Sequence, residues 1–354
     1  MGIARQSSAR CKAVLARRQG GERRPQANPN PNPNPNRGGE LVYAKGRDPH
    51  EFAEYVRGLR IPPGYTDVEV CMPGESILYH AKDSNGKAQM RQSAATVEHR
   101  EQVAKPARIR RLTPDVWARL DKAVDAALRQ TTWSTTKLAA VAVLLIQACF
   151  FRPGSDTPHQ EHFGVVSLQK KHLRSNTGSE CHFEFVGKAH QTNRCRVGAD
   201  TRLCRLLRSL QGKDTHSDAR LFSKDGKKLT VKAMRDFLRN ATDGRVRPKD
   251  IRTYQANLTF LDAMASGESS QRVRALLQEK RRNASWTRDM RKAAGPAIVK
   301  TAERLNNTKA VAKSSYILSP VMRAFEEGTV TLAQLDLTPA EMLMELLVPR
   351  DPSS

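Results

Sequence analysis

The feature that most restricts how this chain can fold is an almost uninterrupted apolar segment, Leu138–Phe151, in which Gln147 is the only polar residue. The segment is too short to span a lipid bilayer. From residue 134 to about 150 it predicts a helix that is buried on most sides and forms the centre of a large domain. The helix is expected to end at Arg152-Pro153-Gly154, because proline cannot continue a helix and glycine favours its end.

The net charge restricts what the chain can bind. Lysine and arginine number 60 against 36 aspartates and glutamates, so the formal charge is +24 and the sequence pI is near 10.2. This balance is typical of proteins that neutralise phosphates. The N-terminus also lacks the apolar core of a secretory signal, so we expect an intracellular, soluble protein. Charge alone leaves a DNA enzyme, a histone-like packing protein, a ribosomal protein and a membrane-surface binder open.

The cysteines show no CxxC pair and no zinc-finger spacing, and we expect reduced, mostly structural thiols. They are Cys11, Cys71, Cys149, Cys181, Cys195 and Cys204.

Three regions follow one another along the chain. Residues 1–40 are predicted to be a disordered tail, rich in arginine and ending in a Pro-Asn repeat over 28–36. The tail is either a flexible DNA-binding arm or an organelle targeting peptide. Residues 41–108 predict a small β-rich domain, since 67–71 and 76–80 alternate like half-buried strands.

Residues 109–354 are predicted to be a larger, mainly helical domain, which gives an α+β fold overall. Thr113-Pro114 is a good helix start, with a capping hydroxyl and proline at the first helical position. A β-hairpin interrupts the helices, because 182–186 and 194–197 alternate on either side of a turn that carries Lys188. Further helices are expected at about 201–211, 230–241, 249–264, 270–281, 286–304, 313–327 and 338–348.

A few basic and aromatic residues stand out by their context. Arg152 directly follows the buried helix, and Lys188 lies at the hairpin bend. Arg252 lies near the head of a helix, and Tyr316 lies near a helix start. They lie in four segments, which are Ala148–Arg152, Phe185–Lys188, Lys249–Tyr254 followed by Asn257, and Leu305–Thr308 with Tyr316. Two further distinctive segments, Ile61–Val68 and Lys82–Lys87, come earlier in the chain.

In these segments the chain resembles a type IB DNA topoisomerase of the small poxvirus and bacterial kind, a family that shares its catalytic fold with the tyrosine recombinases. The resemblance covers residues 41–330. It implies that Tyr316 attacks a DNA phosphate and forms a 3′-phosphotyrosyl bond. It also implies that Arg152 and Arg252 stabilise the charged phosphate oxygens, and that Lys188 on a mobile hairpin protonates the leaving 5′ oxygen. The remaining family position, often histidine, is Asn307 here, with a helix-capping role as the alternative.

The resemblance implies further contacts with duplex DNA. Lys87 and Gln89 are kept in a run that usually carries two tyrosines, both missing here, so strict sequence readout is in doubt. Other expected DNA-binding residues are Lys82, Lys249, Tyr254, Asn257 and Lys313. The two domains are expected to form a clamp around DNA. We expect a monomer that relaxes supercoils of both signs without ATP, metal or another cofactor, and that has no membrane or small-molecule partner.

Two other functions fit part of the pattern. A site-specific tyrosine recombinase commonly has a helical N-terminal domain and a histidine where this chain has Lys249. A non-catalytic duplex DNA-binding protein explains the charge, but it would be expected to lose pocket residues. A protein that acts on DNA is expected in a compartment that contains DNA, which is a nucleus, a nucleoid or a viral particle or factory. Targeting to an organelle by the tail is a further option.

Overall fold

The computed structural model describes residues 15–16, 40–41, 49–156, 162–174, 180–279 and 285–348, in two compact units, 1–100 and 101–354. The predicted disordered tail lies outside the described residues, apart from two short antiparallel strands, β1 (Leu15–Ala16) and β2 (Glu40–Leu41). Each unit is described by itself below. In the described part, no helix has the length and apolar character needed to cross a membrane.

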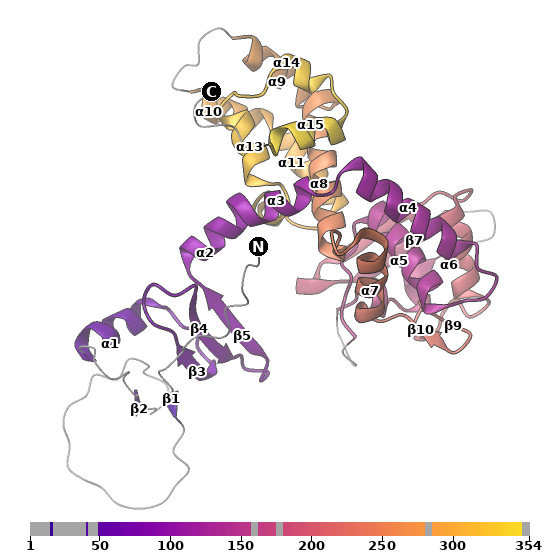
Figure 1. Ribbon diagram of the computed structural model, residues 1–354, viewed down its shortest axis with the longest axis horizontal. Coiled ribbons are helices and arrows are strands. Elements are labelled where there is room, and N and C mark those ends of the chain that lie inside the picture. Colours follow the sequence, from indigo (N-terminus) through magenta and orange to yellow (C-terminus); the bar gives the residue numbers. More distant parts are fainter. Residues whose placement is uncertain are drawn as a thin grey trace, which may run out of the picture. The chain divides into compact units, whose positions relative to one another are not determined.

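The first unit is an antiparallel sheet with one helix packed on it. Its strands β3 (Thr66–Val70), β4 (Ile77–Lys82) and β5 (Ala88–Gln92) follow one another in the sheet (Figure 1). Helix α1 (Pro49–Gly58) contributes Phe52 and Val56 to a core that includes Val68 and Tyr79. Helix α2 (Ala94–His99) follows the sheet. The β-rich character was predicted, whereas α1 and β5 were not.

The second unit is mainly helical and contains the predicted hairpin, so the α+β prediction is confirmed. Its elements are η1 (Arg100–Ala104), α3 (Lys105–Arg110), α4 (Pro114–Leu128), α5 (Thr135–Cys149), η2 (Val165–Ser167), η3 (Lys170–His172), β6 (Leu173–Arg174), β7 (Cys181–Val186), η4 (Lys188–His190), β8 (Thr192–Val197), α6 (Arg202–Gln211), β9 (Ser223–Lys224), β10 (Lys227–Lys228), α7 (Val231–Thr242), α8 (Pro248–Ser266), α9 (Ser270–Gln278), α10 (Trp286–Ala293), α11 (Gly295–Arg304), α12 (Lys309–Ser315), α13 (Ser319–Glu326), α14 (Leu332–Leu335) and α15 (Pro339–Leu346).

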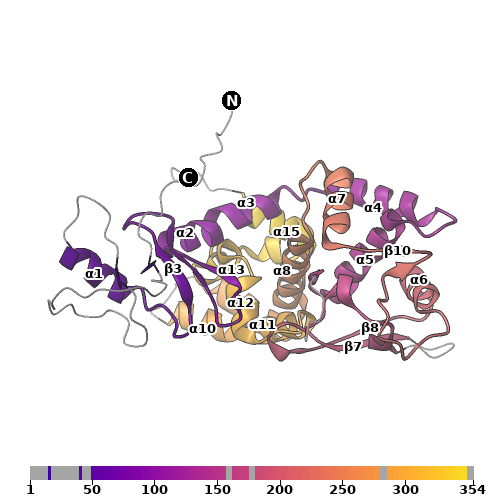
Figure 2. The same cartoon turned by 90° about the horizontal axis from the view of Figure 1, so that it is seen from below.

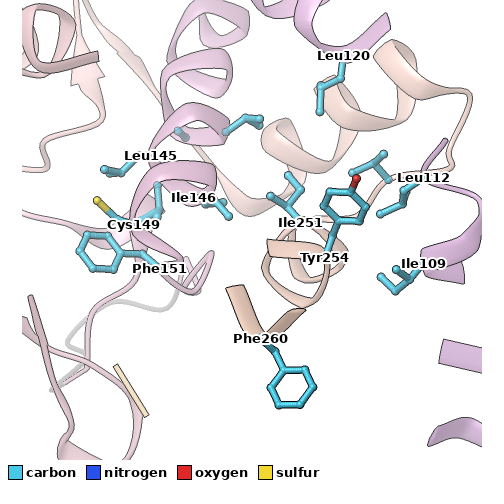
Figure 3. Close-up of a cluster of buried hydrophobic side chains, with 14 of the residues drawn as sticks. Ile109, Leu112, Leu120, Leu145, Ile146, Cys149, Phe151, Ile251, Tyr254 and Phe260 are labelled. Carbon is cyan, nitrogen blue, oxygen red and sulfur yellow. The ribbon is translucent and has the colours of Figure 1, made fainter. Parts of the chain in front are cut away.

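Two long helices hold this unit together. Helix α5 is the predicted buried helix, and most of its side chains are fully buried. Helix α8 packs against α5 and α7 as well as against α11 and α15, so it lies between two groups of helices (Figure 2). The residues that face α5 and α4 from α8 include Ile251 and Tyr254, which Figure 3 shows beside Leu112 and Ile146. Residues on α8 are therefore buried on nearly every side.

Helix boundaries differ from the predictions where proline starts a new helix. The helix expected over 286–304 is divided into α10 and α11, with Pro296 in the first turn of α11. The helix expected over 313–327 is divided into α12 and α13, with Pro320 in the first turn of α13. Proline has no amide hydrogen to donate and is favoured in a first turn, so each one permits a helix to begin there. Thr113 does precede α4, but its hydroxyl makes no capping hydrogen bond.

The expectation of reduced cysteines was wrong. Cys149 at the end of α5 is bonded to Cys195 in β8, and Cys181 in β7 is bonded to Cys204 in α6. In each pair the Cα atoms are 5.6 Å apart, a normal separation for a disulfide. The partners are 46 and 23 residues apart in sequence, and only the docking of the hairpin on the helices brings them together.

Candidate active site

Arg252 lies in the first half of α8 and is almost completely buried, with 2% of its surface exposed. Its guanidinium donates from Nη1 to the Tyr316 hydroxyl at 2.6 Å and from Nη2 to the Leu305 carbonyl at 3.4 Å. Its Nε donates to the carbonyl of Phe150. Burial lowers the pKa of Arg252 to about 10, and Tyr316 partly opposes this shift. The side chain therefore carries a positive charge at neutral pH, fixed against the tyrosine oxygen.

Tyr316 occupies the break between α12 and α13, three residues before α13 begins, where one continuous helix over 313–327 was expected. Only 2% of it is exposed, and it belongs to a small apolar cluster with Phe150, Leu305 and Ala312. The Arg252 guanidinium also lies over its ring, 4.8 Å from the ring centroid. The hydroxyl is thus the polar end of an otherwise packed side chain.

Asn257 fixes the backbone on both sides of this tyrosine. Its Nδ2 donates to the carbonyl of Tyr316 at 3.0 Å, and its Oδ1 accepts from the amide of Leu318, also at 3.0 Å. Nδ2 donates as well to the carbonyl of Thr253, one turn earlier in α8. We predicted Asn257 to contact DNA, but the structure buries it completely and engages both ends of its amide.

Arg152 and Asn307 meet at the edge of this cluster. Arg152 Nη2 donates to Asn307 Oδ1 at 3.3 Å, and both residues are partly exposed. Asn307 does not cap α12, because Thr308 occupies the cap and accepts from the Val311 amide. A capping role at the start of α12 therefore does not fit this geometry, and Asn307 Nδ2 instead donates to the carbonyl of Leu305, the C-cap residue of α11, at 3.1 Å.

A close approach of two glycines supports the loop that carries Arg152. Gly154 has a φ of +88°, which favours glycine, and a Cβ on Gly164 would collide with the backbone of Gly154. The amide of Val165 also donates to the Arg152 carbonyl at 2.9 Å. The backbone of Arg152 is thus held from two directions.

Lys188 lies at the exposed bend of the β7–β8 hairpin, as predicted. Ala189 and His190 in the same bend have φ angles of 62° and 56°, a conformation that non-glycine residues seldom adopt. Within the described residues, no hydrogen bond or ion pair joins Lys188 to Tyr316, Arg152, Arg252 or Asn307. The structure therefore brings four of the five residues together and leaves Lys188 on a separate projection.

Two contacts tie the base of this hairpin to the site. One is the disulfide between Cys195 and Cys149, which precedes Arg152 by three residues. The other is a hydrogen bond from the Arg194 amide to Asn306 Oδ1, at 2.8 Å. Asn306 has a φ of 49°, which asparagine tolerates better than most residues. Asn306 was not predicted to be a site residue, although it lies directly beside the predicted residue Asn307.

The remaining predicted DNA-binding residues divide into exposed and buried ones. Lys87, Lys249 and Lys313 are exposed. Lys82 pairs with Asp67 at 2.8 Å, and Gln89 Nε2 donates to Asp83 Oδ2 at 2.7 Å.

Tyr254 is buried, contrary to its expected place on DNA. Its ring packs on Trp117 with 4.8 Å between ring centroids, and 7% of the residue is exposed. Figure 3 shows it among apolar side chains. It is a core residue, and its position on α8 between two helix groups explains why.

A buried arginine on a tyrosine hydroxyl, with a second arginine and an amide close by, supplies the groups of an enzyme that breaks phosphodiester bonds through a tyrosine. Comparison with known proteins agrees with this class. The family model described as eukaryotic DNA topoisomerase I, catalytic core, matches residues 91–334. The chain therefore belongs to the type IB DNA topoisomerases, and it is a DNA topoisomerase.

Viral relatives support the same assignment. DNA topoisomerase 1B of Acanthamoeba polyphaga mimivirus is 23% identical over 291 residues, which cover 78% of this chain and 80% of the relative. DNA topoisomerase 1B of vaccinia virus, strain Copenhagen, is 24% identical over 281 residues, or 77% and 82% of the two chains. DNA topoisomerase I of monkeypox virus matches to the same extent. The predicted family and activity are thus confirmed, and the recombinase and the non-catalytic binder are set aside.

Proposed function

We propose that this topoisomerase nicks one strand of duplex DNA with Tyr316 and reseals it after strand rotation. The observation that carries the proposal is the 2.6 Å hydrogen bond from Arg252 Nη1 to the Tyr316 hydroxyl. A positive charge at this position orients the hydroxyl and also lies where a phosphate bound to Tyr316 would be. Arg252 thus serves the nucleophile first and the phosphate afterwards.

The bond changes balance within one strand. The Tyr316 oxygen forms a bond to phosphorus and gives up its proton to solvent water, while the bond from phosphorus to the 5′ oxygen breaks. Arg152 and Asn307 donate to the nonbridging oxygens, on which negative charge builds up. Lys188 protonates the departing 5′ oxygen, which otherwise leaves as a strongly basic alkoxide.

Lys188 has to approach the phosphate when DNA is bound. The bend that carries it is exposed, whereas the base of the hairpin is tied down by Cys195 and Arg194. We propose that the bend moves toward the phosphate while β8 stays attached to the rest of the site.

Resealing is the reverse attack by the 5′ hydroxyl. The phosphotyrosyl bond retains the free energy of the phosphodiester, so the cycle needs no ATP. The residues named above supply both the charge stabilisation and the proton, so it needs no metal ion. Supercoils of either sign are released when the DNA downstream of the nick rotates.

The DNA is held mainly through phosphates. We propose that the β-rich domain and the helical domain act as the two lobes of a clamp, in a monomer, with the exposed lysines Lys82, Lys87, Lys249 and Lys313 at the DNA surface. Binding through phosphates releases counterions, so affinity falls steeply with salt.

The enzyme works in a compartment that contains DNA, such as a nucleus, a nucleoid or a viral particle. The basic tail over residues 1–40 is either a targeting peptide or a DNA-binding arm. Removing it lowers DNA affinity and the salt dependence of binding only if it is an arm.

The test is relaxation of a supercoiled plasmid in EDTA without ATP. We expect the wild type to relax both positive and negative supercoils and to form a covalent complex with the 3′ end of the cut strand. Tyr316→Phe removes the nucleophile and should abolish both activities while DNA affinity stays within about 3-fold, because most affinity comes from phosphate contacts elsewhere. Relaxation or a covalent complex in Tyr316→Phe would overturn the assignment.

A further inference from the structure

Three polar residues with a spacing of three form a stripe along the first turns of the second unit. The stripe consists of Gln102 in η1 and of Lys105 and Arg108 in α3. Neighbouring members of the stripe are three residues apart, a spacing that brings side chains close together on the surface of a helix. Each reaches a different helix of the catalytic unit. None of these three was singled out from the sequence.

Lys105 is the central member of the stripe, and 4% of it is exposed. Its ammonium group donates to the carbonyl of Ser315 at 2.8 Å and to Glu101 Oε2 at 2.8 Å. A buried ammonium is costly unless it is paired and hydrogen-bonded, so these contacts hold Lys105 in one place. A lysine that only served solubility would lie on the surface.

Ser315 is the residue directly before Tyr316 and the last residue of α12. Carbonyls in the last turn of a helix have no partner within the helix, and a cation there is favourable. Lys105 supplies that partner from a distant part of the chain. Since Asn257 binds the carbonyl of Tyr316 itself, two successive carbonyls at the nucleophile are bound by buried side chains.

The other two members of the stripe reach neighbouring parts of the same site. Arg108 Nε pairs with Asp250 Oδ1 at 3.3 Å, and Asp250 is buried in α8 two residues before Arg252. Gln102 Oε1 accepts from Arg323 in α13 at 2.8 Å. The stripe therefore contacts the segments on both sides of the Arg252–Tyr316 hydrogen bond.

We propose that Lys105 is a positioning residue for the nucleophile, acting through the Ser315 carbonyl to hold the backbone that presents the Tyr316 hydroxyl. This inference rests on the proposed role of Tyr316. The contact orients the free tyrosine before attack. Once Tyr316 is bonded to DNA, the covalent bond itself fixes the tyrosine, and the contact matters less. Loss of Lys105 should therefore slow cleavage more than religation.

The experiment measures single-turnover cleavage and religation on a suicide substrate, for the full chain and its variants. Lys105→Met keeps the length and apolar stem of the side chain and removes the ammonium. We expect its cleavage rate constant to fall about 10- to 100-fold, the size of effect that small misplacements of reacting groups produce. We expect the fold-decrease in the religation rate constant to be less than about a third of the fold-decrease in the cleavage rate constant. We expect DNA affinity to be unchanged. Lys105→Arg, which keeps a charged donor, should recover most of the cleavage rate.

Arg110→Met is the matched control, because Arg110 lies on the same helix and is exposed. It should cleave at the wild-type rate. An unfolded fraction of Lys105→Met would lower the amplitude of both reactions and leave their rate constants unchanged, so poor folding does not imitate the expected result. Equal losses in cleavage and religation, or an unchanged cleavage rate constant, would overturn the role of Lys105. Failure of the proposed function is seen separately, as a covalent complex formed by Tyr316→Phe.

Discussion

The guanidinium of Arg252 and the hydroxyl of Tyr316 are joined by a 2.6 Å hydrogen bond. The two residues are 64 positions apart in the sequence, and both are at most 2% exposed. Three features keep the pair together. Arg252 donates hydrogen bonds to two backbone carbonyls, Asn257 donates one to the carbonyl of Tyr316, and apolar side chains pack around the tyrosine ring. Packing and hydrogen bonds within the protein therefore hold the proposed nucleophile against the Arg252 guanidinium.

The first prediction concerns the shape of the Arg252 side chain. Arg252→Lys keeps a positive charge but cannot donate to Tyr316, Phe150 and Leu305 at the same time, because an ammonium is a compact charge on a flexible stem. We expect its single-turnover cleavage rate to fall at least about 100-fold, as for the loss of a fixed donor to a charged oxygen. A cleavage rate within about 5-fold of the wild type would show that charge alone suffices.

The second prediction concerns the proton for the leaving group. Lys188→Ala should cleave ordinary DNA about 100- to 10,000-fold more slowly, the usual range for general acid catalysis. A substrate with a 5′-phosphorothiolate at the cleavage site releases a thiolate, which needs no proton, and should restore most of the rate. Asn306→Ala loosens the base of the same hairpin and should show a smaller defect with the same rescue. Absence of rescue in Lys188→Ala would exclude the general-acid role.

The third prediction concerns the Cys149–Cys195 and Cys181–Cys204 disulfides. Cys195 is partly exposed, whereas Cys181 and Cys204 are fully buried, so a mild reductant should open the Cys149–Cys195 bond first. Alkylation of released thiols followed by mass spectrometry measures the order. A bond across 46 residues stabilises the fold by up to about 4 kcal/mol in the loop-entropy description. Cys195→Ser should unfold at lower denaturant concentration by a corresponding amount. Simultaneous opening of both bonds would contradict this order.

The fourth prediction concerns acid stability near the hairpin. His172 is buried, with its ring 4.3 Å from that of Phe163 and its Nδ1 accepting from the Gln169 amide. Burial lowers the pKa of His172 to about 4, the charge of Lys171 lowers it as well, and Asp218 opposes the shift. The folded protein thus holds His172 neutral, while the unfolded chain takes up a proton below a pH of about 6.5.

The sign of the effect follows from this difference. The contribution of His172 to the free energy of unfolding should be constant above about pH 6.5. Between about pH 6.5 and 4 it should fall by up to about 3 kcal/mol, because the unfolded chain binds a proton that the folded protein does not. Urea unfolding of the wild type and of His172→Gln at several pH values measures it. The variant should lose this part of the pH dependence, and identical pH profiles for the two proteins would contradict the explanation.

Much of the architecture follows from local patterns in the sequence. The buried helix α5, the β7–β8 hairpin with Lys188 at its bend, and the helix that carries Arg252 were all predicted, because periodicity and turn residues act over a few positions. The five site residues followed from the resemblance in the motifs around them, and the family assignment is confirmed. Their roles remain proposals that the experiments above test.

What only the tertiary structure decided is which side chains face one another. A helix over 249–264 was predicted, with Tyr254 and Asn257 on DNA, but α8 packs between two helix groups, so both residues are buried. The disulfides, the break at Tyr316, and the contact of Lys105 with the Ser315 carbonyl depend on segments brought together from far along the chain. A local pattern indicates which face of a helix is apolar. A partner 210 positions away, however, depends on how whole helices pack, which no short stretch of sequence determines.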